Sequence, residues 1–125
     1  MAAIPARYTF STGERLKSRK IIDELFRRKS FYSCPGFRLY YMTLDAPLSE
    51  FAAQYAFAVS KKHFPKAPDR NRVKRLMREA VRLRKVDWAF TPGTQVAFLL
   101  MFTGQQLPEY AAVEKAVEKL FRQNA

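Results

Sequence analysis

The sequence predicts an α+β fold, a single-domain α/β sandwich in which helices pack on a small mixed sheet. Segments with helical and strand-like hydrophobic patterns are interleaved along the chain, in the order α-β-β-α-β-α. The length of 125 residues suits one core. With 48% hydrophobic residues, the chain is too apolar to be a disordered basic tail. We therefore expect one folded domain over residues 1–125, with flexible ends at residues 1–9 and 123–125.

The first helix is expected to begin at a capping box and to run to about Arg28. Ser11 and Glu14 have the spacing at which each side chain bonds the backbone amide of the other residue. The apolar residues that follow fall mostly on one stripe: Leu16, Ile21, Ile22, Leu25 and Phe26. Basic side chains occupy much of the remaining surface, so this helix would expose a cationic side.

The strands are predicted from alternation. Residues 37–44 follow a Pro-Gly break and carry aromatic side chains on both faces. Residues 54–60 alternate larger side chains with Ala56 and Ala58, which leave room for a helix on that face. Residues 96–102 form a nearly continuous apolar run, typical of a strand covered on both faces. A further short strand would fit around residues 30–33.

Two more helices complete the pattern. The second is predicted to begin at Asp69 as N-cap, because Pro68 should prevent an earlier start. Its buried face is marked by apolar residues at helical spacing: Val73, Leu76, Met77, Ala80 and Leu83. The last helix begins near Pro108, and we interpret its apolar i, i+3, i+7 pattern as core.

Several classes of function are disfavoured by composition. The chain has one cysteine, Cys34, and one histidine, His63, which within one copy cannot form a disulfide, a multi-thiolate zinc site or a histidine-dependent triad. We interpret Cys34 as an inert residue near a strand and His63 as a solvated loop residue, and we expect no catalytic residue and no metal site. No apolar stretch reaches the ~20 residues that span a bilayer. Residues 1–7 lack the features of a signal peptide, so the predicted location is cytoplasmic.

The charge is unevenly distributed, which favours a polyanionic partner. The net charge is +12, and residues 60–85 contain eleven Lys and Arg against two acidic residues. In the predicted second helix, bases recur at every fourth position: Arg70, Lys74, Arg78 and Arg82. Each like-charged i, i+4 pair destabilises a helix by roughly 0.2–0.5 kcal/mol. An anionic membrane is disfavoured as partner, because there is no Trp-rich apolar face and no lipidation signal.

A charged helix is most often only a solvated face. Here the single sign of the charges and the position of Arg70 and Arg72 at the positive end of the helix dipole favour bound phosphate instead. Composition does not separate RNA from DNA. Four aromatic residues are candidates for stacking on bases, with core packing as the alternative: Phe26, Phe37, Tyr40 and Tyr41.

The order of residues in the basic region resembles the signature of the bacterial ribonuclease P protein component. The matching run is Ser60-Lys61-Lys62 followed by Arg70-Asn71-Arg72-Val73-Lys74-Arg75-Leu76-Met77-Arg78-Glu79-Ala80. Weaker upstream matches are Arg15-Leu16-Lys17, Phe26-Arg27-Arg28 and Phe37-Arg38-Leu39-Tyr40. The resemblance extends from about Arg7 to Phe121. The chain departs from the family in a glycine-free loop at residues 63–69, and in Lys29 or Ser30 where a glycine is common.

The resemblance implies an α/β sandwich with a left-handed βαβ crossover, against the general rule. It also implies a function: the protein binds a catalytic RNA and the 5′ leader of precursor tRNA, and assists endonucleolytic removal of that leader to give the mature tRNA 5′ end. The protein would be the accessory subunit of this ribonuclease, with the catalytic centre and its Mg²⁺ in the RNA. No cofactor of the protein alone and no obligate protein partner are implied.

The resemblance also assigns residues. Those expected to contact the catalytic RNA are Lys61, Lys62, Lys66, Arg70, Asn71, Arg72, Lys74, Arg75 and Arg78. Those expected to line a cleft for the leader, between the first helix and the sheet, are Arg19, Phe26, Phe37 and Tyr40, with Lys61 as an alternative source of charge to Arg19. Two other functions stay open: a non-catalytic RNA-binding protein of the ribosomal type, and a DNA-binding regulator that places the basic helix in a major groove.

Overall fold

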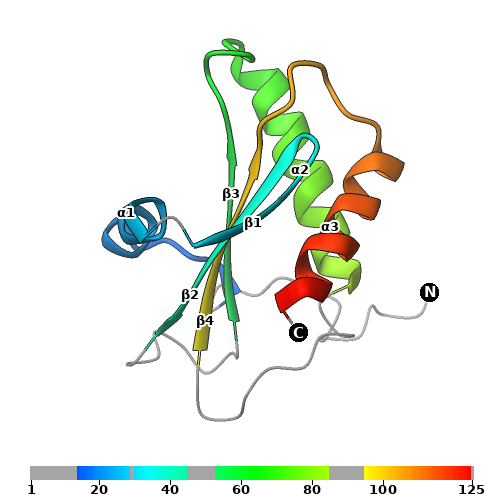
Figure 1. Cartoon of the computed structure of the whole chain (residues 1–125). Coiled ribbons are helices and arrows are strands. Elements are labelled where there is room, and N and C mark those ends of the chain that lie inside the picture. Colours follow the sequence, from blue (N-terminus) through cyan, green and yellow to red (C-terminus); the bar gives the residue numbers. More distant parts are fainter. Residues whose placement is uncertain (1–13, 29, 45–52, 85–94, 125) are drawn as a thin grey trace, which may run out of the picture.

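The computed structural model describes residues 14–28, 30–44, 53–84 and 95–124 (Figure 1). Its elements in chain order are α1 (Arg19–Arg28), β1 (Phe31–Cys34), β2 (Phe37–Leu44), β3 (Ala53–Val59), α2 (Ala67–Arg84), β4 (Gln95–Phe102) and α3 (Tyr110–Asn124). The predicted order is confirmed, including the additional short strand. Of the ends expected to be flexible, residues 1–9 and residue 125 lie outside the described residues, whereas residues 123 and 124 belong to α3.

The four strands form one mixed sheet in the order β1-β2-β4-β3. The pairs β1–β2 and β2–β4 are antiparallel, whereas β3 and β4 are parallel. Because parallel neighbours need a crossover, the connection through α2 makes β3–α2–β4 the expected βαβ unit. The left hand of this crossover stays a prediction. The sheet leaves β1 and β3 as its two edges.

The sheet separates two apolar layers (Figure 1). α2 and α3 cover one face, and α1 is the one described helix on the other. Side chains alternate between these layers because a strand has a period of two. On β2, Leu39 packs under α2 and α3, whereas Tyr40 and Met42 pack under α1. The predicted room for a helix next to Ala56 and Ala58 is confirmed, since both pack in the α1 layer.

A two-residue turn joins β1 to β2 and sets their register. Cys34 pairs with Phe37, so Pro35 and Gly36 alone make the turn. Gly36 has a φ of 85°, which a type II turn requires at its second central position and which only glycine adopts at low cost. The turn is also bonded to the end of β4, because the N–H of Thr103 donates to the Gly36 carbonyl oxygen (2.8 Å).

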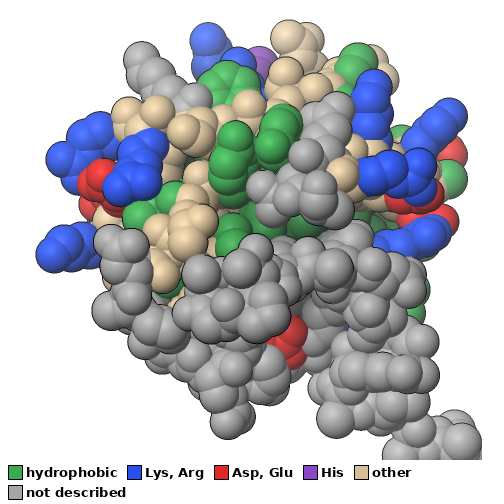
Figure 2. Space-filling model, turned by 60° about the horizontal axis from the view of Figure 1, so that its bottom comes forward, with side chains coloured by type: hydrophobic (Ala, Val, Ile, Leu, Met, Phe, Trp, Pro, Cys, Tyr) green, Lys and Arg blue, Asp and Glu red, His purple; other side chains and the backbone are tan. Residues whose placement is uncertain are grey.

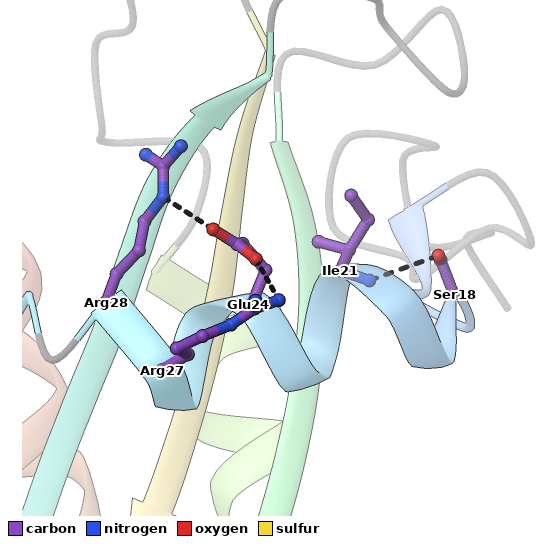
Figure 3. A network of polar contacts seen from close by, with 5 residues as sticks. All are labelled: Ser18, Ile21, Glu24, Arg27 and Arg28. Carbon is purple, nitrogen blue, oxygen red and sulfur yellow. Dashed lines mark hydrogen bonds and ion pairs between the residues drawn. The ribbon is translucent and has the colours of Figure 1, made fainter.

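The predicted start of the first helix was wrong. Residues 14–18 are not part of α1, which begins at Arg19 (Figure 3). The cap is Ser18, whose Oγ accepts a hydrogen bond from the N–H of Ile21 (3.3 Å). Upstream, the N–H of Leu16 donates to the carbonyl oxygen of Tyr55 (2.8 Å), so the chain there pairs with the edge of β3 instead of coiling. This competing bond is non-local and leaves no local pattern in the sequence.

The second helix also begins earlier than predicted. α2 starts at Ala67, and Pro68 lies in its first turn, where a missing N–H removes no helical hydrogen bond. The N–H of Arg70 donates to the carbonyl oxygen of Lys66 (3.3 Å). Asp69 is therefore not the N-cap but a first-turn acid, which the helix dipole favours.

Candidate nucleic-acid interface

The loop between β3 and α2 is held by three anchors. The N–H of Phe64 donates to the carbonyl oxygen of Ser60 (3.1 Å), and the Ser60 Oγ accepts from the N–H of Lys62 (3.2 Å). Phe64 is buried and its ring lies 5.8 Å from that of Phe102. Arg70 closes the loop, because its Nη1 donates to the carbonyl oxygens of Phe64 (2.9 Å) and Pro65 (2.8 Å). These contacts fix the conformation of the loop although it contains no glycine.

The four basic residues spaced by four along α2 have different surroundings. Arg70 contacts the loop, as described, and Arg82 forms an ion pair with Glu79 through Nε and Nη2. Lys74 and Arg78 instead turn toward the edge of β3, where the Arg78 guanidinium lies 5.7 Å from the centre of the Phe57 ring. Glu79 thus relieves the repulsion between these basic residues only at the Arg82 end, and the middle of α2 keeps its uncompensated positive charge.

A pocket of about 350 Å³ lies at the edge of β3, next to Lys74 and Arg78. Arg15, Lys17 and Ile22 contribute to its lining from the other side. The pairing of Leu16 with Tyr55 brings this segment to the strand edge. Four cations from two distant parts of the sequence therefore surround one cavity, as an anionic ligand requires. The sequence did not single out Arg15 or Lys17 as site residues, because only the non-local pairing places them there.

The remaining cations predicted to contact RNA lie on the surface. Exposed side chains of the loop and of α2 are Lys61, Lys62, Lys66, Asn71, Arg72 and Arg75. Together with the pocket, they extend the basic surface from the end of β3 along the first half of α2. The structure thus brings the predicted cations together on neighbouring elements, although Arg70 has a structural bond as well.

The α1 face carries a row of aromatic rings. Phe26 of α1 meets Tyr40 of β2 edge-on, with ring centres 5.1 Å apart, and Tyr40 meets Phe31 of β1 at 5.3 Å. The outer rings are accessible, at 38% for Phe26 and 37% for Phe31, while Tyr40 between them is 6% exposed. Tyr40 therefore supports the rings of Phe26 and Phe31, while its own ring is largely inaccessible to a ligand. Arg19 is exposed two helical turns before Phe26, on the same side of α1.

The assignment of Phe37 to the cleft was wrong. Phe37 is 4% exposed and packs in the layer of α2 and α3, with its ring 5.1 Å from that of Phe102. Alternation along β2 puts it on the face opposite Tyr40. Phe31 lies on the α1 face instead, directly opposite Tyr40 in the register. A two-residue Pro-Gly turn, together with the alternation of the strands, was the signal that could have identified Phe31.

Tyr41, a further stacking candidate, also lies away from the α1 face. It is half-buried and stacks on Tyr32 at 4.8 Å. A hydrogen bond with Tyr32, aided by burial, raises the pKa of Tyr41. It therefore packs within the sheet, as the alternative interpretation had it.

Cys34 and His63 are both half-buried, at the end of β1 and in the loop before α2. Burial raises the pKa of the Cys34 thiol, and nearby Lys119 only partly opposes this. The thiol is thus the dominant form at neutral pH, which makes a weak nucleophile. No helix within the described part of the chain is both long and apolar enough to span a membrane.

Figure 2 shows how charged and hydrophobic side chains are distributed on one face of the molecule. Lys and Arg side chains gather at the left and right of this view, and hydrophobic side chains lie between them. Basic groups together with accessible aromatic rings are the combination that single-stranded nucleic acid requires. The fold and the surface together define a small, basic α+β protein suited to a polyanionic ligand.

Comparison with known proteins identifies the family to which this small basic protein belongs. Residues 10–124 match the family model Ribonuclease P. The ribonuclease P protein component of Porphyromonas gingivalis is 34% identical over 118 residues, which cover 92% of this chain and 85% of the relative. That of Chlorobium phaeobacteroides is 45% identical over 76 residues, or 58% of this chain and 51% of the relative. The chain belongs to the ribonuclease P protein family.

Solved structures share the fold. The RNase P protein from Thermotoga maritima superimposes with a TM-score of 0.71 at 17% identity, covering 88% of this chain and 96% of that one. The Staphylococcus aureus RNase P protein gives a TM-score of 0.69 at 17% identity, covering 89% and 94%. The predicted fold class, helices packed on a small mixed sheet, is thereby confirmed.

Proposed function

We propose that this chain is the protein subunit of ribonuclease P, and that it binds both the catalytic RNA and the 5′ leader of precursor tRNA. The observation that carries the proposal is the presence of two different surfaces on one small fold. One is cationic and runs along the loop and α2 to the β3 edge. The other, on the α1 face, presents accessible aromatic rings. Family membership supports the same conclusion.

The cationic surface suits a folded RNA. Arginine side chains bind phosphate through two N–H groups at once, and Arg72 and Arg75 are exposed on α2 for such contacts. Asn71 beside them has both donor and acceptor groups for base edges. The hydrogen bonds of the loop hold Lys61, Lys62 and Lys66 near the start of the same helix, so these basic side chains form one preformed surface.

The aromatic surface suits an unpaired strand. Bases of a single strand are free to stack, and each base on an aromatic side chain contributes about 1–3 kcal/mol. Phe26 presents such a ring, and Arg19 adds charge on the same side of α1. The leader of precursor tRNA is the strand that we assign here. The hydrolytic step and its Mg²⁺ belong, in this proposal, to the catalytic RNA, while the protein binds and orients.

Cleavage of precursor tRNA by a bacterial ribonuclease P RNA at low magnesium, with and without the chain, tests the function. We expect strong stimulation, because the protein's cations replace magnesium in neutralising phosphate. The double variant Arg72→Ala/Arg75→Ala should lose much of the stimulation. Lys115→Ala/Lys119→Ala, with the same loss of charge from exposed positions on α3, should keep it. Absence of stimulation by the wild-type chain, or its association with ribosomal particles alone, contradicts the proposal.

A further inference from the structure

We propose that Phe31 and Arg38 form an additional nucleotide-binding position, which takes one unpaired base of the RNA strand on the α1 face. The inference rests on the proposed function and extends it to the β1 edge of the sheet. Among the described residues, four large hydrophobic side chains are exposed, and two of them, Phe26 and Phe31, share Tyr40 as their support. The exposed ring of Phe31 is thus part of a built arrangement and not an isolated surface residue.

Arg38 makes this position suitable for nucleic acid. Its guanidinium carbon lies 5.1 Å from the centre of the Phe31 ring. No carboxylate among the described residues forms an ion pair with Arg38, so its charge is not neutralised within the described parts of the protein. A guanidinium held on an aromatic ring offers a flat cationic surface, on which a base stacks while the charge faces the adjoining phosphate.

The sheet itself connects this position to the basic pocket. One row across the α1 face consists of Ala58, Met101, Arg38 and Ser33, paired from β3 through β4 and β2 to β1. None of these four residues is buried, whereas the next row is buried at Leu99 and Tyr40 under α1. α1 crosses this face at mid-height, and no other described helix lies on that side (Figure 1).

The open row therefore runs along one side of α1. At the β3 edge it begins at Ala58, which follows the pocket-lining residues Ala56 and Phe57. At the other end lie Arg38 and Ser33, and the Arg38 guanidinium reaches over the Phe31 ring of the neighbouring row. Four strands span about 14 Å, enough for more than one nucleotide of an extended strand. A strand lying in this row would contact cations at both ends and apolar side chains between them. That pattern fits a single RNA strand, with phosphates at the charged ends and a base stacked on the guanidinium that Phe31 supports.

A fluorescent-base scan on the reconstituted holoenzyme tests the position. Precursor tRNAs carry 2-aminopurine at successive leader nucleotides, and quenching is measured with wild-type chain and with Phe31→Leu. Leucine keeps an apolar contact with Tyr40 but has no ring. We expect one leader nucleotide to lose its quenching in the variant, and affinity for leader-bearing tRNA to fall about 5- to 150-fold. Phe31→Trp should restore both. Arg38→Lys, which keeps the charge without the planar group, should lose quenching at the same nucleotide.

The controls separate this inference from the proposed function. Leu107→Ala, at an equally exposed apolar residue before α3, should behave as wild type. Affinity for mature tRNA without a leader should not change in Phe31→Leu. If the wild-type chain stimulates cleavage but no leader position responds to Phe31→Leu, the inference is wrong and the function stands. A loss of affinity for the catalytic RNA in Phe31→Leu, with leader quenching intact, would equally overturn it.

Discussion

Arg70 shows how one residue can serve both the fold and the interface. The sequence pattern assigns it to RNA, and the structure adds two hydrogen bonds from its Nη1 to the carbonyl oxygens of Phe64 and Pro65. These bonds tie the loop to the first turns of α2. The remaining N–H groups of the guanidinium keep donors for a phosphate. Lysine could supply the charge but has fewer N–H donors than the guanidinium.

Replacing Arg70 should therefore lower stability as well as RNA affinity. Arg70→Ala leaves two carbonyl oxygens without their charged donor, and we expect the free energy of unfolding to fall by about 1–2 kcal/mol. Urea denaturation measures this loss, and amide hydrogen exchange should accelerate at residues 61–66. Arg75→Ala is the matched control on the same helix, because Arg75 is exposed; its effect should stay within about 0.5 kcal/mol. Equal stability of the two variants would contradict the structural role of Arg70.

At the scale of elements, α2 connects the basic surface to the core. Its buried residues pack under the sheet, and its last turn contacts α3 through ion pairs of Arg84 with Glu114 and Glu118. Within α2, the Arg82 guanidinium donates from Nε to Glu79 Oε2 (3.0 Å). This hydrogen bond is the main reason why the pKa of Glu79 is lowered. The half of α2 near α3 is thus neutralised, and the half near the loop is left free for an anion.

The lowered pKa of Glu79 gives a pH dependence of defined sign. Its contribution to stability is complete above the pKa of an unfolded glutamate, about 4.3, and is lost as the pH falls through the lower folded value. The difference in unfolding free energy between wild type and Glu79→Gln should therefore be largest near neutrality and shrink toward about pH 3. Thermal or urea unfolding across this range measures it. Adding Arg82→Gln to Glu79→Gln should not alter the remaining pH dependence, and a constant difference at all pH values would refute the assignment.

At the scale of the whole molecule, the two helical layers divide the surface by chemistry. α2 presents cations past the β3 edge, and α1 leaves the row from Ala58 to Ser33 on the opposite face unburied. A polyanion bound along both surfaces releases many counterions, because each phosphate contact displaces condensed salt. The excess of positive charge, +12 over the chain, also accelerates association with RNA.

Binding to the catalytic RNA should accordingly depend steeply on salt. With roughly 6–10 phosphate contacts, affinity should fall about 10³- to 10⁵-fold between about 50 and 200 mM salt. Arg72→Ala should reduce the slope of log affinity against log salt by about one. Lys115→Ala on α3 should leave the slope unchanged. Filter binding or fluorescence titration over a salt series provides the values, and a nearly flat response would exclude an interface dominated by phosphate.

Much of the fold could be predicted because its determinants are local. Periods of two and of 3.6 placed the strands and helices, and the spacing of the basic residues predicted the basic face of α2. The start of α1 could not be predicted, because a hydrogen bond between Leu16 and Tyr55 decides it, and these residues are far apart in the sequence. The first turn of α2 was misplaced for a different reason, since the rule against proline does not hold at a helix start.

The sequence by itself determined the elements, the basic helix and the family to which the chain is similar. Only the tertiary structure decided which aromatic rings are accessible on the α1 face. Alternation shows that Phe37 and Tyr40 lie on opposite faces of β2. Because helices cover both faces, the apolar pattern does not show which of the two residues lies on the α1 face. Packing under α2 and α3 buries Phe37, and the turn at Gly36 sets Phe31 beside Tyr40 instead. The long-range pairing of Leu16 with Tyr55 likewise brings Arg15 and Lys17 to the pocket beside Lys74 and Arg78.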